Sequence, residues 1–402
     1  MRRRDLLGAS VLAALGVRSA PAGRWRPTMN DRELTLFLCG DVMLGRGIDQ
    51  IQPRASRPEL FEPYVRSALD YVELAEGVTG PLPRNVPPAY VWGDALDEWA
   101  RVRPDARILN LETAVTTSEA AWPGKGIHYR LHPANVGVLA AAGIHCCGLA
   151  NNHVLDWGRA GLGETLDTLH AAGLHTAGAG HTAQEAAQPA ILPVGERARV
   201  LVFAFATLDC GTGRDWAATD TRAGLALLPE LSASAVAEIA ARVRAVKQPG
   251  DVVVASIHWG GNWGYRVPAA QRAFAQALIE SARVDVVYGH SSHHFKGLEV
   301  YRQRLILYGC GDFLNDYEGI SGYESYRGEL GLMYFPTLDA RDGTLRRLTL
   351  TPTEVRHFRV NRARPDEARW IAATLDRESR PFGTRVEWAS KGELRLAPEK
   401  RT

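Results

Sequence analysis

The chain has 402 residues, of which 46% are hydrophobic and 23% are charged, a composition typical of globular proteins and unlike that of disordered or fibrous chains. Its 47 basic and 45 acidic residues leave a formal net charge of +2, which excludes a predominantly basic nucleic-acid or membrane-surface protein. Recognition of a charged partner must therefore be local, and we expect no nucleic-acid partner.

Residues 1–22 have the order of an export signal. Three arginines at 2–4 precede an apolar run at 6–17, and Ala20-Pro21-Ala22 has the small-residue spacing of a cleavage site. The run is shorter than the ~20 residues that cross a bilayer, and the consecutive arginines favour the twin-arginine route. We expect an exported, periplasmic or extracytoplasmic protein. The alternatives are a misassigned start codon or an uncleaved segment that tethers the protein to a membrane.

Apolar, β-rich runs recur along the chain and alternate in part with helical patterns. The predicted strands are 34–40, 106–112, 144–151, 199–206, 251–259, 284–290 and 304–313. Helical periodicity marks 158–173 and 268–282. Near-continuous hydrophobic strands separated by helices indicate a layered α/β domain whose strands are covered on both faces.

The five cysteines form neither a disulfide nor a zinc pattern, because their number is odd and no two are spaced Cys-x-x-Cys. Cys39, Cys147 and Cys310 lie in strand-like apolar runs, where a free cysteine is usually a small buried residue. We expect these three in the core.

The C-terminal part adds an antiparallel pair and a tail. Residues 330–340 and 345–358 flank Asp342-Gly343, a strong hairpin signal, and are expected to close the sheet. Long loops, which are often functional lids, are expected at 77–93, 208–224 and 315–329. The expected organisation is a main domain at 33–360, then a C-terminal helix and peripheral tail at 361–402 that contains a candidate hairpin at 386–396.

Residues of metal-ligand type follow five of the predicted strands. Asp41, Glu112, Asn152, His258 and His290 each come just after the end of an apolar run. Open α/β sheets place ligand sites at such strand ends. A single aspartate there is usually a helix cap and a single histidine a structural residue, but five in succession indicate a shared crevice. Carboxylates, an amide and imidazoles suit a divalent ion.

Several motifs in this order resemble those of the CapA family of capsule and poly-gamma-glutamate synthesis proteins. They are GDVMLGR at 40–46, NLET at 110–113, LANNHVLDWG at 149–158, GAG at 178–180, HWG at 258–260, GHSSHHFKGLEVY at 289–301 and LYGCGDF at 307–313. The resemblance extends from about residue 34 to about residue 316. It implies a single main domain similar to calcineurin-like metallophosphoesterases, an α/β sandwich with central mixed sheets flanked by helices.

The resemblance also implies roles for individual residues around one or two divalent ions, with Mn, Fe, Zn and Mg as candidates. The implied ligands are Asp41 and His293 for the first ion, Glu112 as the bridge, and Asn152, His258 and His290 for the second ion. His153 matches the catalytic histidine that contacts the scissile group and protonates a leaving oxygen. Two ions close together would acidify a shared water and clamp the attacking and leaving oxygens.

Three departures from the metallophosphoesterase pattern affect the first ion most. Asp41-Val42-Met43 stands where Asp-x-His is usual, Glu112 replaces an aspartate, and the last motif is GHxxH rather than GHxH. A thioether is a poor ligand for hard ions, so Met43 is expected to pack in the core. The first metal position is therefore expected to be weak or empty, and mononuclear chemistry stays open.

Four further residues are candidates for binding an anionic substrate: Arg46, Lys125, His294 and Asp312. Each has the alternative of an exposed or capping residue. Asp156, in VLDWG, is interpreted first as a helix N-cap.

Aromatic residues near the motifs also have two interpretations. Trp259 and Trp263 form either an apolar wall of the site or core. The tyrosines of the 315–329 loop either cover the pocket or pin the loop to the domain; they are Tyr317, Tyr323 and Tyr326.

Two hypotheses about function follow. The first is a metal-dependent hydrolase of capsule or poly-gamma-glutamate metabolism that cleaves a phosphoester or a gamma-glutamyl amide bond. The second is a non-catalytic, metal-containing accessory that holds an anionic polymer and passes it to membrane-bound capsule synthesis proteins during assembly or export.

Overall fold

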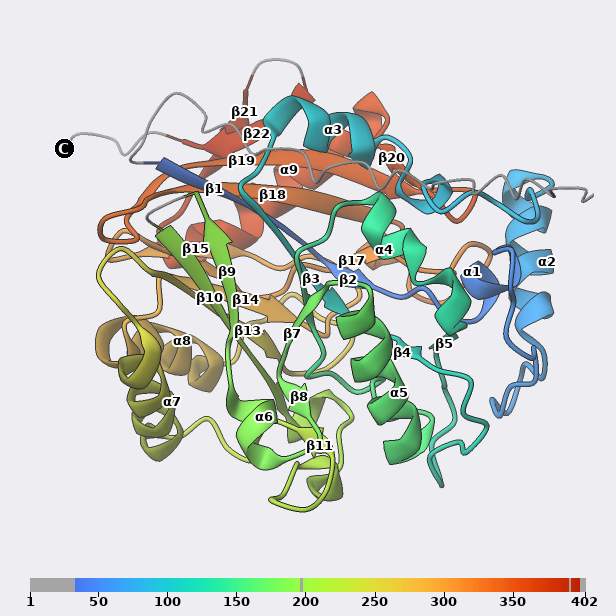
Figure 1. Ribbon diagram of the computed structural model, residues 1–402. Helices are drawn as coiled ribbons and strands as arrows, with labels where there is room; N and C mark the ends of the chain where they lie inside the picture. Colours follow the sequence, from blue (N-terminus) through green and yellow to red (C-terminus); the bar gives the residue numbers. More distant parts are fainter. Residues whose placement is uncertain (1–32, 196–197, 390–391, 398–402) are drawn as a thin grey trace, which may run out of the picture. The chain divides into compact units, whose positions relative to one another are not determined.

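Two mixed β-sheets form the centre of the fold in the computed structural model (Figure 1). The structure describes residues 33–195, 198–389 and 392–397, so the predicted export signal at 1–22 lies outside the described residues. Within these ranges, each helix is too short or too polar to cross a membrane.

The larger sheet has eleven strands. Its main path runs β17 (Asp312–Leu314), β2 (Asp41–Val42), β3 (Ala106–Leu111), β1 (Glu33–Cys39), β18 (Leu330–Asp339), β19 (Leu345–Val355), β22 (Leu394–Leu396) and β21 (Val386–Trp388). Three strands branch from this path: β20 (Val360–Arg362) on β19, and β6 (Cys146–Gly148) followed by β7 (His175–Ala177) on β3. Strands β2, β3 and β6 pair in parallel, so they end at the same edge of the sheet.

The smaller sheet has seven strands in the order β12 (Leu227–Leu228), β10 (Ala198–Thr207), β13 (Val252–His258), β14 (Val286–His290), β16 (Arg304–Leu307) and β15 (Leu298–Tyr301), with β9 (Ala190–Val194) also paired to β10. The central strands β10, β13, β14 and β16 are parallel. Two short pairs complete the strands: β8 (Ala179–Gly180) with β11 (Gly224–Leu225), and β4 (Ala114–Val115) with β5 (Arg130–Leu131).

Nine α-helices connect the strands within the described ranges. They are α1 (Gly47–Gln50), α2 (Ala68–Thr79), α3 (Ala95–Val102), α4 (Gly137–Ala141), α5 (Gly158–Ala171), α6 (Ala183–Ala187), α7 (Ala233–Val246), α8 (Ala269–Ala282) and α9 (Pro365–Ser379). Helix α7 shows why such a segment folds: Ser232 caps its first turn, and Val236, Ile239 and Val243 bury one face at helical spacing. It lies beside α8 against the smaller sheet (Figure 1).

Alternation along β10 divides the core into two layers. Its even-numbered side chains, from Val200 to Ala206, belong to the main core shared with the larger sheet, whereas Leu201, Phe203 and Phe205 pack with α7 and α8. Strands β13 and β14 have the same alternation, since Val254 and Tyr288 face the main core. His258 and His290, also even-numbered, therefore point to the side of the smaller sheet that faces the larger one.

Tyr288 joins the two sheets directly. Its hydroxyl donates to the carbonyl oxygen of Cys39 at 2.5 Å and accepts from the Cys39 amide at 3.1 Å. Both residues are fully buried. The contact therefore holds β1, which leads to Asp41, at a fixed separation from β14, which ends at His290.

Several predictions at this level are confirmed. The layered α/β class is correct, Cys39, Cys147 and Cys310 are buried, and the 330–340 and 345–358 segments pair antiparallel as β18 and β19. The candidate hairpin at 386–396 is present as β21 and β22.

Two details are corrected. The segment 304–313 is not one strand: it forms β16 in the smaller sheet and β17 in the larger, and Gly311, with φ 74°, lies where the chain passes between them. The β18–β19 pair does not close the sheet, because β22 and β21 extend it beyond β19. The 361–402 segment contains α9, whose Ile371 and Leu375 are fully buried in the main core.

A candidate metal centre between the two sheets

Two motif glycines allow the ligand-bearing segments to approach one another. A Cβ on Gly40 would lie 2.2 Å from the Gly311 carbonyl oxygen, and a Cβ on Gly289 would lie 2.6 Å from two backbone oxygens. Each therefore permits a backbone contact that any side chain would prevent. The residues after these glycines, Asp41 and His290, consequently lie at the junction of the sheets.

Strand register places the predicted ligands side by side. His258 and His290 are direct neighbours at the ends of β13 and β14, and Asp41 pairs with Asn110 of β3. Ligand atoms of Asp41, Glu112 and His258 all lie within 4.8 Å of one another, and all three residues are buried. His290 Nδ1 lies 2.7 Å from Asp41 Oδ1. Four side chains from both sheets therefore converge on one point.

Three of the predicted ligands carry buried polar atoms without hydrogen-bond partners. They are Glu112 Oε2, Asn152 Oδ1, and both ring nitrogens of His290. The close contact between His290 Nδ1 and Asp41 lacks hydrogen-bond geometry. A buried polar atom left unpaired costs about 1–3 kcal/mol, so the cluster suits an additional group that accepts electron pairs from oxygen and nitrogen. A divalent cation fits this donor set.

The electrostatics of the cluster also favour a cation. Burial raises the pKa of Glu112 well above its usual value, and the nearby negative charges of Asp41 and Asp312 raise it further. Burial opposes ionisation of Asp41 too, yet the adjacent His290 holds its pKa well below the usual range. Burial lowers the pKa of His258 to about 3, which leaves a neutral imidazole with a free lone pair.

An asparagine pair that the sequence did not single out ties the ligands together. The Asn110 amide donates to Asp41 Oδ1 at 2.8 Å and lies 3.3 Å from His258 Nδ1, thereby contacting a ligand in each sheet. Asn151 donates to Asn110 Oδ1 at 3.1 Å and accepts from the backbone N–H of His153 at 3.0 Å. The only sequence signal was their position inside the NLET and ANNH motifs.

His153 is oriented by a buried carboxylate. Its Nδ1 lies 2.7 Å from Asp156 Oδ2, while its Nε2 lies 3.7 Å from Glu112 Oε1. Burial lowers the pKa of His153 to about 4 despite the opposing charge of Asp156, so the neutral ring donates from Nδ1 and leaves Nε2 open toward the cluster. The prediction that Asp156 caps a helix is wrong, because the cap position of α5 is Trp157 and no side chain caps it.

Lys125 is held by the same aspartate. Its ammonium forms an ion pair with Asp156, donates to the Asn152 carbonyl oxygen at 2.5 Å, and lies 3.1 Å from His153 Nδ1. Its side chain is 16% exposed, so the charge lies at the margin of the site and is already paired.

His293 lies next to the cluster rather than inside it. Its Nδ1 is 3.1 Å from Asp312 Oδ1, and Asn315 donates to the other Asp312 oxygen at 2.8 Å. Burial opposes protonation of His293, but the charge of Asp312 raises its pKa above the usual value. Met43 is fully buried, as expected, and its sulfur accepts a weak hydrogen bond from the Tyr317 hydroxyl at 3.7 Å.

The other residues expected to bind substrate are engaged elsewhere. The guanidinium of Arg46 is paired with Glu62 at 3.0 Å and Asp316 at 2.5 Å and lies 3.8 Å from the centre of the Tyr71 ring. His294 donates to the Phe295 carbonyl and accepts from Gly264 N–H at 3.0 Å, so neither nitrogen remains for a ligand. Asp312 is committed to His293 and Asn315.

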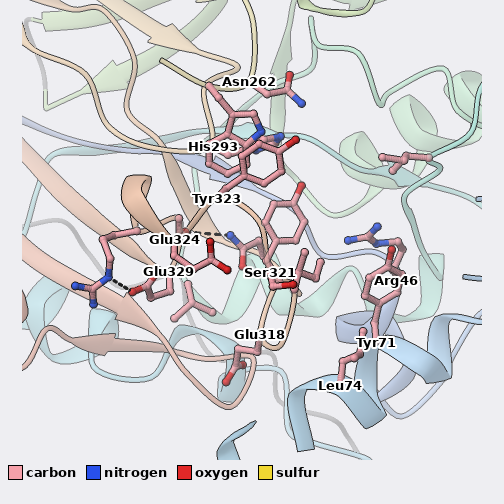
Figure 2. A pocket seen from close by; sticks show the side chains of 18 of the residues that line it. Arg46, Tyr71, Leu74, Asn262, His293, Glu318, Ser321, Tyr323, Glu324 and Glu329 are labelled. Atoms are coloured by element: carbon pink, nitrogen blue, oxygen red, sulfur yellow. Dashed lines mark hydrogen bonds and ion pairs between the residues drawn. The ribbon is translucent and has the colours of Figure 1, made fainter. Parts of the chain in front are cut away.

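A cavity of about 760 Å³ opens beside this centre, and Figure 2 shows its lining. His293 and Arg46 line it together with residues of the 315–329 loop, among them Tyr317 and Tyr323. Trp263 also lines it, while Trp259 is a core residue whose indole N–H donates to the Tyr308 carbonyl at 3.0 Å.

The chain is similar to several known proteins. A "Probable polyglutamine synthesis accessory protein" of Mycobacterium tuberculosis is 43% identical over 370 residues, covering 92% of this chain and 97% of the relative. The "Capsule biosynthesis protein CapA" of Bacillus anthracis is 25% identical over 312 residues, covering 77% of this chain and 67% of the relative. A crystal structure described as a novel phosphatase of Mycoplasma pneumoniae is 11% identical, with a TM-score of 0.44, over 84% of this chain and 96% of that chain.

The motif segments coincide with a known family. The model of the family described as "Bacterial capsule synthesis protein PGA_cap" matches residues 35–317, which span every ligand-bearing strand end from Asp41 to His293. The chain belongs to this family of bacterial capsule synthesis proteins.

Proposed function

We propose that this protein is a divalent-metal-dependent hydrolase of capsule or poly-gamma-glutamate metabolism, which cleaves a phosphoester or a gamma-glutamyl amide bond. The observation that carries the proposal is the Asp41–Glu112–His258 cluster, together with the unpartnered buried atoms on the predicted ligands Glu112, Asn152 and His290. A purely structural polar network is normally satisfied internally. The names of the relatives support the biological setting.

The residues suited to hold the ion are Asp41, Glu112, Asn152, His258 and His290, with His293 adjacent. A divalent ion bound by them supplies Lewis-acid polarisation of the scissile phosphoryl or carbonyl group. Mn, Fe, Zn and Mg are all compatible with mixed oxygen and nitrogen donors. Because Met43 offers no hard ligand, a mononuclear site on the Glu112 side is the simplest arrangement.

His153 is proposed as the group that exchanges a proton with the reacting atoms. Asp156 fixes its ring through Nδ1, and the open Nε2 faces Glu112 at 3.7 Å. A substrate atom held at the cluster would therefore lie within reach of Nε2. Lys125 stabilises the ionised form of Asp156 and with it the orientation of the ring.

The test is turnover by the purified chain in excess Mn²⁺, on a chromogenic phosphodiester and on poly-gamma-glutamate. We expect hydrolysis of at least one substrate and its loss in His153→Ala. Elemental analysis of the same samples must show that the variant still binds metal. Protein that is loaded with metal and inert on both substrates would refute the catalytic proposal.

A non-catalytic function has one specific observation in its favour, namely the buried Met43 where the first motif would carry a ligand. In that case the protein is a metal-containing accessory that holds an anionic polymer for membrane-bound synthesis proteins. Metal stoichiometry and affinity separate the two: one or two tightly bound ions favour hydrolysis, and none or one weakly bound ion favours the accessory function.

We also propose export to the periplasmic or extracytoplasmic side, on the evidence of the arginines at 2–4 and the apolar run at 6–17. Cell fractionation of the whole chain and of an Arg3→Lys/Arg4→Lys variant tests this. Equal amounts of both proteins outside the cytoplasm would contradict the twin-arginine route.

A further inference from the structure

The cavity beside the metal centre is built from segments that are far apart in sequence. Residues of α2, of the loop before it, of the 262–263 segment and of the 315–329 loop all line it, and Figure 2 shows their side chains around the space. His293, one of the predicted ligands, belongs to the lining. Tyr129, whose ring lies 4.5 Å from that of His153, contacts the lining residue Arg46. The cavity therefore lies next to the metal centre.

Much of the lining that meets solvent is hydrophobic. Five of its side chains are large hydrophobic groups that are between 37% and 69% exposed: Tyr64, Leu74, Ile127, Ile320 and Tyr323. Exposed hydrophobic side chains scattered singly need no explanation, but a group that surrounds one cavity marks a binding site. The ring of Tyr323 is stacked on Trp263 at 4.1 Å and 5°, which makes a flat aromatic wall.

The arginines of the lining are already paired. Each of its two arginines is bridged by two carboxylates: Arg46 by Glu62 and Asp316, and Arg327 by Glu329 and Glu367. Three glutamates but no lysine are found among the lining residues. Both oxygens of Glu318 accept backbone N–H groups, from His357 at 2.8 Å and Phe358 at 2.6 Å.

These contacts leave no unpaired arginine in the lining to bind a polyanion. A gamma-glutamyl chain carries one free carboxylate per residue, and binding it along the cavity would place those carboxylates against glutamates and neutralised arginines. Such a chain would not remove the exposed hydrophobic side chains of the lining, the hydrophobic rim, from water. An uncharged hydrophobic group, by contrast, removes the exposed rim from water without breaking an ion pair.

We propose that the cavity binds an uncharged hydrophobic group, a hydrocarbon chain or an aromatic ring, attached to the anionic group that the metal centre holds. This inference rests on the proposed function, because the metal centre anchors the anionic end of the substrate. It assigns the substrate to amphiphilic phosphoesters or amides rather than to the interior of a free polyglutamate chain.

The test is isothermal titration of the Mn²⁺-loaded, full-length protein with methyl-, butyl-, octyl- and phenylphosphonate, and with tri-gamma-glutamate. We expect the dissociation constant to fall at least about tenfold from methyl to octyl, within the roughly fourfold per methylene that complete burial gives. Tighter binding of phenyl- than of butylphosphonate would identify a ring, and the reverse order a chain. Tri-gamma-glutamate is expected to bind more weakly than octylphosphonate.

Two isoleucines provide a matched control. Ile320 lines the cavity and is 44% exposed, whereas Ile191 lies in β9 outside it and is 37% exposed. Ile320→Asn should reduce the octyl-to-methyl affinity ratio at least threefold, and Ile191→Asn should leave it unchanged. Equal affinity for methyl- and octylphosphonate, or tighter binding of tri-gamma-glutamate, would overturn the inference alone. Failure of every phosphonate to bind would overturn the metal anchoring as well.

Discussion

Replacement of Asp156 by asparagine tests how the candidate site works. Asp156 Oδ2 lies 2.7 Å from His153 Nδ1 and also accepts from Tyr129 N–H at 2.7 Å, and the other carboxylate oxygen is paired with Lys125. Asparagine keeps the shape but removes the charge that favours the Nδ1–H form of the ring. His153 Nε2 would then lose its fixed orientation toward Glu112.

The expected loss follows from the one charge-assisted hydrogen bond that is removed. Such a bond contributes about 1.5–3 kcal/mol, which corresponds to a fall in kcat of about 10- to 150-fold. KM and the metal content should change little, because neither ligand atoms nor the cavity lining is altered. Turnover of a chromogenic phosphodiester, with elemental analysis of the same preparation, measures both quantities.

Asp251→Asn is the matched control for this prediction. Asp251 is also a buried aspartate paired with a cation, Arg199 at 2.5 Å, but it precedes β13 at the end opposite His258. It should lower stability and leave kcat unchanged. Activity of Asp156→Asn within threefold of the parent, or an equal loss in both variants, would refute the positioning role.

Three further results are expected. Glu112→Gln removes a charged ligand from the cluster and should at least halve the metal bound per chain by elemental analysis; unchanged stoichiometry would exclude Glu112 as a ligand. Tyr288→Phe removes the hydroxyl that bonds both Cys39 backbone groups and should lower the free energy of unfolding in urea by about 1–3 kcal/mol, whereas no change would show that the sheets do not depend on this bond. Burial raises the pKa of Asp49 from 3.8 to about 6, so ionisation of Asp49 opposes folding. The stability that protonated Asp49 contributes is therefore complete below pH ~3.8 and lost as the pH rises to about 6. Asp49→Asn should remove that decline, worth up to about 3 kcal/mol, when unfolding is compared at pH 4 and pH 7; a parent protein equally stable at both would contradict it.

The strand ends were predictable because buried parallel strands are nearly continuous runs of hydrophobic residues. Strands β10, β13 and β14 lie within one or two residues of the predicted ranges. The polar residue that interrupts such a run marks the edge of the sheet, and so Asp41 and His258 could be singled out from the sequence. The hydrophobic run at 304–313 was wrongly predicted to be one strand, because hydrophobicity does not say which sheet a strand joins.

The contacts between segments could not be predicted in this way. The amide of Asn110 reaches both Asp41 and His258 only because of strand register and the spacing of two sheets. Arg46 looked available to an anion, but its partners Glu62 and Asp316 are 16 and 270 positions away along the chain. Asp156 follows His153 by three residues in a turn, which sequence alone does not distinguish from the start of a helix.

The position of the metal centre between the sheets orders the events of folding. Asp41 is contributed by the larger sheet and His290 by the smaller, and the two are 249 positions apart in the chain. Their contact therefore requires the closure of a very long loop, which comes late in folding and not early. No earlier, partly assembled chain offers the complete ligand set. Metal uptake should thus follow docking of the sheets, so the compartment in which the chain folds determines which ion it acquires.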